Sequence, residues 1–242
     1  MRTIGDSRIL ARHIGDEEVI MRSIGGEEIY LAHPKSGLYR QFDGTNNTGF
    51  GYDPSVTAWA DLQGNAPATL INATFANNGV LFNGNVNAKV TFSGQNVREY
   101  TIINTFNLAA RTGQHPRINA ENPYPTMYLQ SNQGYAIAFY GQGKDMAFSP
   151  AYIPPTNTAI TAAMCWSGPG NPVELYVNGE YKGATTVINT YPGTVSTMYL
   201  GANSTATRTF TGTIHEHLVY GNARSADEIM FNANVSRSKF DF

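Results

Sequence analysis

The residues between Arg111 and Tyr152 combine aromatic rings with hydrogen-bonding side chains, as a sugar-binding surface requires. Aromatic rings stack on sugar rings, and amide or guanidinium groups bind the hydroxyls. Long loops rich in Tyr, Asn, Gln and Gly also carry function more often than they serve structure alone. We therefore predict a carbohydrate site drawn from this stretch: Arg117, Asn119, Tyr124, Tyr128, Asn132, Tyr140 and Tyr152. The competing interpretation, the commoner one for any single tyrosine, is a strand residue whose ring fills the core.

Two histidines raise the question of a metal. His215 and His217 are two positions apart in an apparent strand, so alternation predicts that they share a face, with Glu216 opposite. We favour an ordinary polar strand face, because spacing identifies no third ligand. Calcium is left open: Asp61 and Asn65 have the oxygen atoms that it prefers, although turn chemistry explains both residues without an ion. No other cofactor is predicted.

Composition excludes several kinds of partner. Charged residues make up 14% of the 242 residues and the formal net charge is −2, which argues against nucleic acid as a ligand. No glycine-rich phosphate loop stands between a strand and a helix. We find no signal peptide and no apolar run that could span a membrane, so we expect synthesis in a cytoplasm without membrane insertion. The single cysteine, Cys165, lies in an apolar run and is predicted to be a buried, inert thiol.

The elements that must position these residues are short strands. From Leu38 onward, alternating apolar runs are separated by clusters of Gly, Pro, Asn and Thr, which predicts an all-β fold, either a sandwich or a barrel. Trp59 and Trp166 are expected in its core. One helix is predicted late in the chain, because Ser225 and Glu228 form a capping box before an apolar segment.

The first 33 residues have a pattern of their own. Three copies of Arg-x-Ile-Gly-Asp/Gly follow one another at a spacing of ten residues, and each contains a turn signal between β-branched residues. We predict a small β-meander that must pack against something else, since three strands this short cannot bury a face alone. The apolar positions assigned to this assembly anchor are Ile4, Ile9, Ile14, Val19, Ile24 and Ile29.

Five segments, in order, resemble the laminin-G/pentraxin-like branch of the concanavalin A-like lectin/glucanase superfamily. They begin with the Trp-x-Asp-Leu opening at 59–65 and end with a strand and helix at 210–229; the others are at 80–84, 175–180 and 199–202. The resemblance implies a concanavalin A-like jelly-roll sandwich of two antiparallel sheets over residues 34–242. His215 departs from it, because the family usually has Asp there.

The resemblance also frames the choice between enzyme and binder. The family's glucanases have an E-x-D-x-x-E pattern that points catalytic carboxylates into the same cleft. None of the twelve acidic residues after position 35 has an acidic neighbour two or three positions away. We therefore expect no catalytic residues and a binding module, with glycan hydrolysis from distant carboxylates as an alternative.

The N-terminal repeat resembles the strand-turn units of bacteriophage tail and baseplate proteins. This resemblance implies a protein of the virion surface that joins other virion proteins through residues 1–33 and forms a homo-oligomer, with a trimer preferred. The sandwich would then bind a glycan of the host surface or of mucus. The alternative is a capsid or tail decoration protein that binds no glycan.

Overall fold

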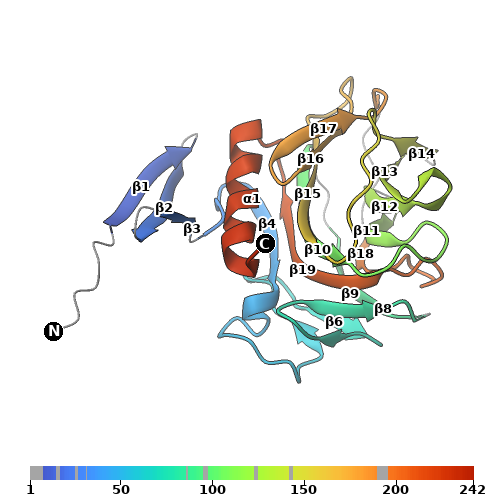
Figure 1. Cartoon of the computed structure of the whole chain (residues 1–242), viewed down its shortest axis with the longest axis horizontal. Helices are drawn as coiled ribbons and strands as arrows, with labels where there is room; N and C mark the ends of the chain where they lie inside the picture. Colours follow the sequence, from blue (N-terminus) through green and yellow to red (C-terminus); the bar gives the residue numbers. More distant parts are fainter. Residues whose placement is uncertain are drawn as a thin grey trace.

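The computed structural model describes residues 8–14, 17–24, 27–30, 32–85, 87–94, 98–122, 125–141, 144–189 and 196–242. Its main part is a sandwich of two eight-stranded sheets (Figure 1). The back sheet has the order β17-β16-β15-β10-β19-β8-β7, and β4 also pairs with β19. The front sheet has the order β14-β13-β12-β11-β18-β9-β6-β5. The pairs in both sheets are antiparallel, so the predicted fold class is confirmed.

The strands of the back sheet are β4 (Leu38–Asp43), β7 (Thr74–Phe75), β8 (Val80–Asn83), β10 (Tyr100–Leu108), β15 (Ala159–Trp166), β16 (Glu174–Val177), β17 (Glu180–Ala184) and β19 (Thr211–Tyr220). The strands of the front sheet are β5 (Ala58–Trp59), β6 (Ala68–Ile71), β9 (Lys89–Ser93), β11 (Arg117–Asn122), β12 (Thr126–Gln130), β13 (Ala136–Gly141), β14 (Lys144–Ala147) and β18 (Thr197–Leu200). Two short 3-10 turns, η1 (Gly44–Asn46) and η2 (Ser131–Gln133), follow β4 and β12.

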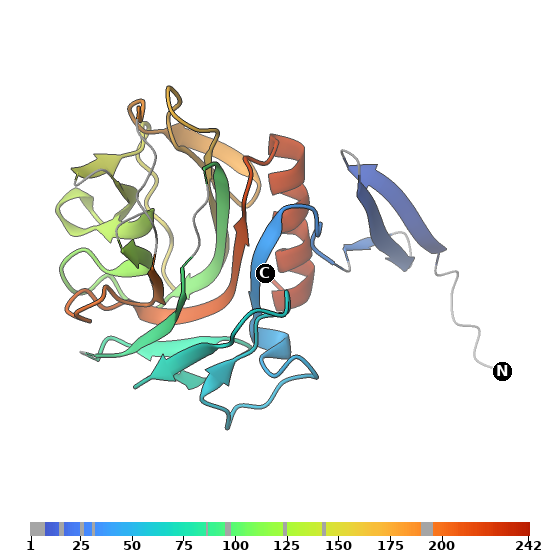
Figure 2. The same cartoon turned by 180° about the vertical axis from the view of Figure 1, so that it is seen from behind.

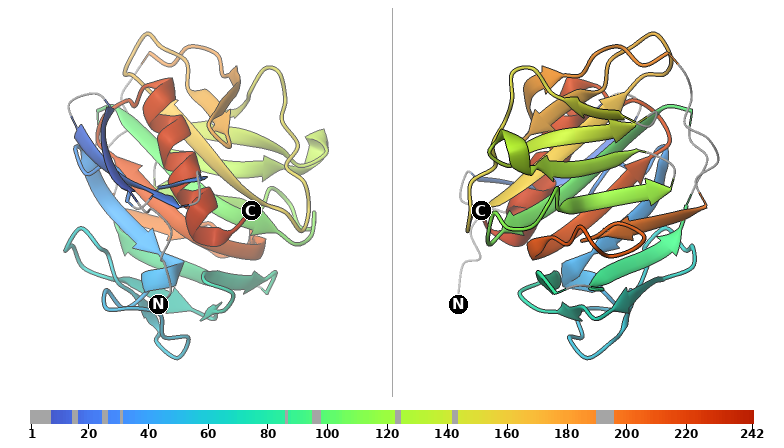
Figure 3. Two further views of the ribbon diagram at one scale, coloured as in Figure 1. Left: turned by 60° about the vertical axis from the view of Figure 1, so that its left-hand side comes forward. Right: turned by 90° about the vertical axis from the view of Figure 1, so that its right-hand side faces the viewer.

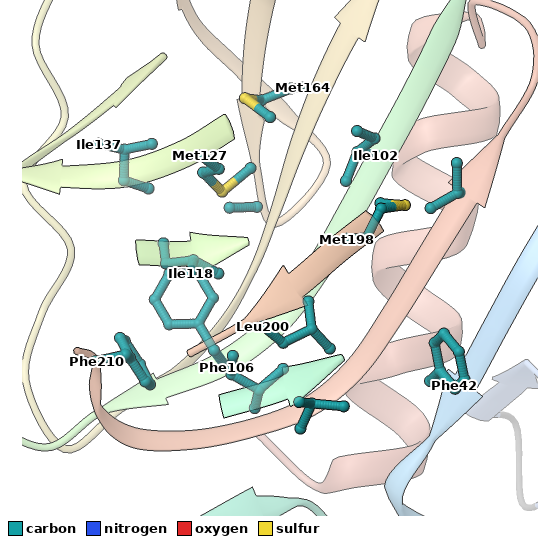
Figure 4. Close-up of a cluster of buried hydrophobic side chains, with 14 of the residues drawn as sticks. Phe42, Ile102, Phe106, Ile118, Met127, Ile137, Met164, Met198, Leu200 and Phe210 are labelled. Atoms are coloured by element: carbon teal, nitrogen blue, oxygen red, sulfur yellow. The ribbon is translucent and has the colours of Figure 1, made fainter. Parts of the chain in front are cut away.

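The core lies between the two sheets, where apolar side chains from both meet (Figure 4). Strand alternation explains which residues face it: Met127 and Leu129 of β12 are fully buried there beside Ile137 of β13. Trp59 and Trp166 are 0% and 1% exposed, which confirms both as core residues.

Helix α1 (Ala226–Phe240) covers the outer face of the back sheet (Figures 1 and 3). It begins at the predicted capping box, in which Ser225 accepts a hydrogen bond from the Glu228 backbone and the Glu228 side chain accepts one from Ser225. Ile229 packs beneath it in a second apolar cluster that includes Cys165. Burial raises the pKa of the Cys165 thiol, as expected of an inert cysteine. Within the described residues, no helix has the length and apolar character needed to cross a membrane.

A buried group of charges joins α1 to the sandwich. Glu216 of β19 is fully buried and receives hydrogen bonds from His33, Lys239 and Ser236. Lys239 also pairs with Asp43 at 2.9 Å. Burial by itself raises the pKa of Glu216, but the charges of His33 and Lys239 outweigh it and hold the pKa well below its usual range. His33, at the end of the predicted N-terminal segment, is thus packed against the sandwich.

The strands β1 (Arg8–Ile14), β2 (Glu17–Ile24) and β3 (Glu27–Tyr30) form a separate antiparallel sheet. Ile14 pairs with Glu17 and Ile24 with Glu27, so each connection has the two-residue length of a tight hairpin. Figures 1 and 2 show this sheet on the far side of α1 from the sandwich, with β3 beside the helix. The predicted β-meander is confirmed; Ile4, in the first copy of the repeat, lies outside the described residues, while Ile9, Ile14, Val19, Ile24 and Ile29 lie on these strands.

The prediction that His215 and His217 share a face is wrong. The pairing of β10 with β19 moves from Thr105–Glu216 to Phe106–Ile214, so His215 is an extra residue in a β-bulge. His217 then faces the core, where its ring lies 5.5 Å from that of Phe92, while His215 lies against Phe240 at the end of α1. A bulge breaks the alternation on which the prediction depended, and Glu216 faces the helix as well.

Candidate functional site

The front sheet gathers Arg117, Tyr128 and Tyr140 on its outer face, which is turned to the viewer in the right-hand view of Figure 3. Arg117 of β11 is the register partner of Tyr128 on β12, and the Arg117 guanidinium carbon lies 4.3 Å from the centre of the Tyr128 ring. It lies 5.4 Å from the Tyr140 ring centre. Tyr140 in turn is the partner of Asp145 on β14. Directly opposed residues share a face, so these four strands place one arginine among two tyrosines and a carboxylate.

The cluster has a buried floor and a partly exposed rim. Arg117 is 5% exposed and Tyr128 is fully buried, whereas Tyr140 and Asp145 retain contact with solvent. His115 closes one side: its ring stands edge-to-face against Tyr128, with 5.6 Å between ring centres. His115 adopts a φ of 51°, which is uncommon for a residue with a side chain, and its Nδ1 accepts a hydrogen bond from the Ser131 backbone.

Three buried polar atoms of this face have no hydrogen-bond partner: Nη1 of Arg117, the hydroxyl of Tyr128 and Oε1 of Gln130. They are three of the eight such side-chain atoms in the described part of the chain. Folded proteins pair nearly all of their buried polar groups, because an unpaired one costs about 1–3 kcal/mol. A cluster of unpaired donors and acceptors beside aromatic rings is the pattern of a surface prepared for a polar ligand.

The electrostatics of the cluster favour negative charge. Burial, and next the charge of Arg208, lowers the pKa of Arg117 to about 10. Burial raises the pKa of Tyr128, and the Asp145 carboxylate, which lies near the phenol hydroxyl without a hydrogen bond of ordinary geometry, raises it further. Burial and then Arg208 lower the pKa of His115. Among the side chains that the structure describes, Asp145 is the one carboxylate that acts on the cluster, against the two guanidinium groups of Arg117 and Arg208.

Asn119 does not join this face, although alternation would place it beside Arg117. The pairing of β11 with β12 moves from Arg117–Tyr128 to Asn119–Met127, and this bulge turns Asn119 inward. Asn119 is fully buried; it accepts a hydrogen bond from Asn104 and donates one to the Pro125 carbonyl. Its position is therefore in the core rather than at the candidate site.

The remaining predicted site residues lie apart or outside the described region. Asn132 is exposed in η2, and Tyr152 is partly buried against the core with the Lys182 ammonium 6.0 Å from its ring centre. Tyr124 lies outside the described residues. Sequence reasoning left out His115, Gln130 and Asp145, all within the stretch that it singled out, and Arg208, which comes from a distant loop. Strand register could have indicated Asp145, but no sequence signal connects Arg208 with Arg117.

The proposed calcium ligands are engaged elsewhere. Asp61 is 7% exposed and pairs with Arg40 at 2.8 Å, and it also accepts hydrogen bonds from Asn65 and from the backbones of Gln41 and Gln63. Both of its oxygens are thus occupied by donors. No cluster of three or more His, Cys, Asp or Glu side chains that could hold a metal ion occurs in the described part of the chain.

A family model described as the concanavalin A-like lectin/glucanases superfamily matches residues 83–230, which is more than half of the chain. It spans strands from both sheets, including every residue of the cluster from His115 to Arg208. No curated protein sequence matches the chain.

Several solved structures have a similar fold at low identity. Trypanosoma rangeli sialidase is 15% identical with a TM-score of 0.63, over 86% of this chain and 34% of the sialidase. Domain 4 of an extracellular arabinanase from Geobacillus stearothermophilus, in complex with arabinotriose, is 19% identical with a TM-score of 0.59, over 83% of this chain and all of that domain. The botulinum neurotoxin serotype D binding domain is 14% identical with a TM-score of 0.62, over 81% of this chain and 51% of that one. The chain therefore spans about a third of the sialidase, and the likeness is one of fold.

Proposed function

Because the chain belongs to the concanavalin A-like lectin/glucanases superfamily, we propose that it is a carbohydrate-binding module and that the cluster around Arg117, Tyr128 and Tyr140 is its binding face. The observation that carries this proposal is the set of unpaired polar atoms on Arg117, Tyr128 and Gln130. Sugar hydroxyls donate and accept hydrogen bonds equally well, so one ligand type can satisfy all three atoms. Tyr140, partly exposed at the rim, offers a ring for stacking.

Binding is favoured over hydrolysis. Most glycosidases use two carboxyl groups about 5–10 Å apart, one on each side of the bond that breaks. The described side chains supply the cluster with one carboxylate, that of Asp145, and surround it with cationic groups. Two of the similar solved structures carry the names of glycosidases, and a hydrolytic module is the alternative that an activity assay on the full chain would reveal.

We place this module on the surface of a bacteriophage particle, where it binds a glycan of the host surface or of mucus. The support for this step is the N-terminal repeat, whose strands form a sheet of their own beyond α1. A three-stranded sheet with two open edges is suited to joining other virion proteins or further copies of this chain, and a trimer is our preferred assembly. The protein would be made in the host cytoplasm and carried outside the cell with the particle.

The test is binding of the full chain to a glycan array and to host cells, comparing the parent protein with Tyr140→Ala. Loss of a stacking ring at a sugar site weakens binding by roughly tenfold. Tyr181→Ala is the matched control, because Tyr181 is an exposed tyrosine of β17, at the edge of the other sheet. Saturable binding weakened by Tyr140→Ala alone supports the proposal. A folded protein that binds neither glycans nor cells would overturn it in favour of a decoration protein.

A further inference from the structure

The Arg117 guanidinium, at the buried floor of the site, bears on which class of saccharide the site can bind. Arg117 is only 5% exposed, and it forms no ion pair with any described carboxylate. A buried charge is costly unless an opposite charge accompanies it. Among the side chains whose burial is described, each of the other two buried arginines has such a partner: Arg40 pairs with Asp61 and Arg224 with Glu228. Arg117 is the exception.

The neighbours of Arg117 add to the positive charge. Arg208 acts on Arg117, His115 and Tyr128, and its side chain also lacks an ion pair in the described structure. The aromatic rings of Tyr128 and Tyr140 lie in cation-π contact with the guanidinium, which stabilises the charge, while Nη1 has no hydrogen-bond partner. Among the described side chains, Asp145, on the rim, provides the single opposing charge.

From this arrangement we propose that the ligand is an acidic saccharide, one that carries a carboxylate such as a uronic or sialic acid, and that Arg117 binds this carboxylate. This inference rests on the carbohydrate-binding function proposed above and specifies its ligand class. The planar guanidinium fork matches the two oxygens of a carboxylate. The hydroxyls of the same sugar then reach the Tyr128 hydroxyl and Gln130 Oε1, and its ring stacks on Tyr140.

In this proposal the ligand reaches the buried guanidinium through movement of the partly exposed side chains around it. His115 lies just before β11, Tyr140 on β13, Asp145 on the edge strand β14 and Arg208 on a loop. Rotamer changes of this kind are common when a ligand binds, and they leave the backbone in place. Arg208 can follow the ligand and contribute a second cation, which strengthens attraction at low ionic strength.

The experiment uses the full chain and matched pairs of saccharides: 3′-sialyllactose against lactose, and trigalacturonate against its methyl ester. Calorimetry measures each affinity in low and in moderate salt. We expect each acidic member to bind about tenfold to a hundredfold more tightly than its neutral counterpart. Salt should weaken binding of the acidic members only.

Variants then assign the effect to a residue. Arg117→Met keeps an unbranched side chain over the tyrosine rings and removes the charge, so it should abolish the preference for the acidic member. Arg117→Lys keeps the positive charge but loses the planar guanidinium group that can bind both carboxylate oxygens. It should therefore retain only part of the parent protein's preference for the acidic member. Arg111→Gln is the control for net charge, because Arg111 is exposed and bonds the Pro154 carbonyl away from the cluster. Circular dichroism confirms that each variant folds.

Each outcome is decisive. Preference for the acidic saccharides, lost in Arg117→Met and kept in Arg111→Gln, supports the inference. Equal binding of acidic and neutral members, or a preference that survives Arg117→Met in a folded protein, overturns it while carbohydrate binding stands. If no saccharide of either pair binds and the glycan array is also negative, the proposed function itself fails and the inference fails with it.

Discussion

Asn104 of β10 donates a hydrogen bond of 2.9 Å to Asn119 of β11, and this bond crosses the interior of the sandwich from the back sheet to the front sheet. Asn104 also accepts a bond of 2.8 Å from His217 Nδ1. All three side chains are fully buried. A chain of polar groups in an apolar core constrains how the sheets pack, because any other arrangement leaves those groups unpaired.

Asn104→Ala should therefore be strongly destabilising. The change removes both bonds and leaves the Asn119 and His217 atoms buried without partners, so we expect the free energy of unfolding to fall by about 2–4 kcal/mol. Urea denaturation measures this. Asn107→Ala is the control: Asn107 is on the same strand, but its Oδ1 has no partner, and its loss should cost less than about 1 kcal/mol. Equal effects of the two changes would contradict a role for the polar chain.

His217 should make stability depend on pH. Burial, and next the charge of Arg40, lowers its pKa from 6.5 to about 3. As the pH falls below 6.5, His217 becomes protonated in the unfolded chain but stays neutral in the folded protein. The stabilisation present above pH 6.5 is therefore lost progressively toward pH 3. The loss should be roughly 1–2 kcal/mol by pH 5, above the range in which carboxylates titrate. Glu216, whose pKa is also lowered, adds a further loss below pH 4.5.

The variant His217→Gln isolates this titration. Glutamine keeps a donor for Asn104 and cannot be protonated in this range. At pH 8, the difference in the free energy of unfolding between parent and variant reports the altered packing. The change in that difference between pH 8 and pH 5 reports the protonation of His217. The parent should lose more stability than the variant over that interval. Parallel curves would show that His217 has the same pKa in the folded and the unfolded protein, which would contradict the prediction.

Two truncations should differ sharply. Deleting residues 1–31 removes the three-stranded sheet and leaves His33, which bonds Glu216 and Asn232 beneath α1. Deleting residues 1–33, the predicted N-terminal segment, also removes this buried histidine. We expect both proteins to lose assembly, measured as molar mass by light scattering, and the shorter one to unfold more easily by about 1–3 kcal/mol. Full assembly of either truncated protein would contradict the anchor role of the N-terminal strands.

Removing calcium should not affect saccharide binding. Of the candidate ligands, Asp61 accepts hydrogen bonds from Arg40, from Asn65 and from the Gln41 backbone, so both of its carboxylate oxygens are already engaged. Binding of the preferred saccharide should be equal in the presence of EDTA and of added calcium. A loss of affinity in EDTA that calcium reverses would show that an ion takes part.

The all-β class, the helix and the general region of the site could be predicted from the amino-acid sequence. Alternating apolar runs between turn residues bury their apolar faces in stacked sheets or in a barrel, and the family resemblance selected the sandwich. The capping box at Ser225 defines a helix start through local hydrogen bonds. The two tryptophans were recognisable as core residues for the same reason. Arg117, Tyr128 and Tyr140 were chosen for their chemistry, and strand pairing places them together.

The direction in which several key side chains point depends on how the strands pair and pack, and the sequence does not show it. The bulges at Asn119 and at His215 each add one residue to one strand, and they reverse the side on which the following residues lie. A bulge depends on how the partner strand pairs and packs, even where that strand is the next one in the chain, as β12 is for β11, so alternation alone cannot reveal it. The same holds for Arg208, brought to Arg117 by a loop, and for His33, whose partner Glu216 is 183 residues away. Local sequence governs hydrogen bonding between near neighbours, whereas the contacts that make a site depend on how the sheets pair and pack.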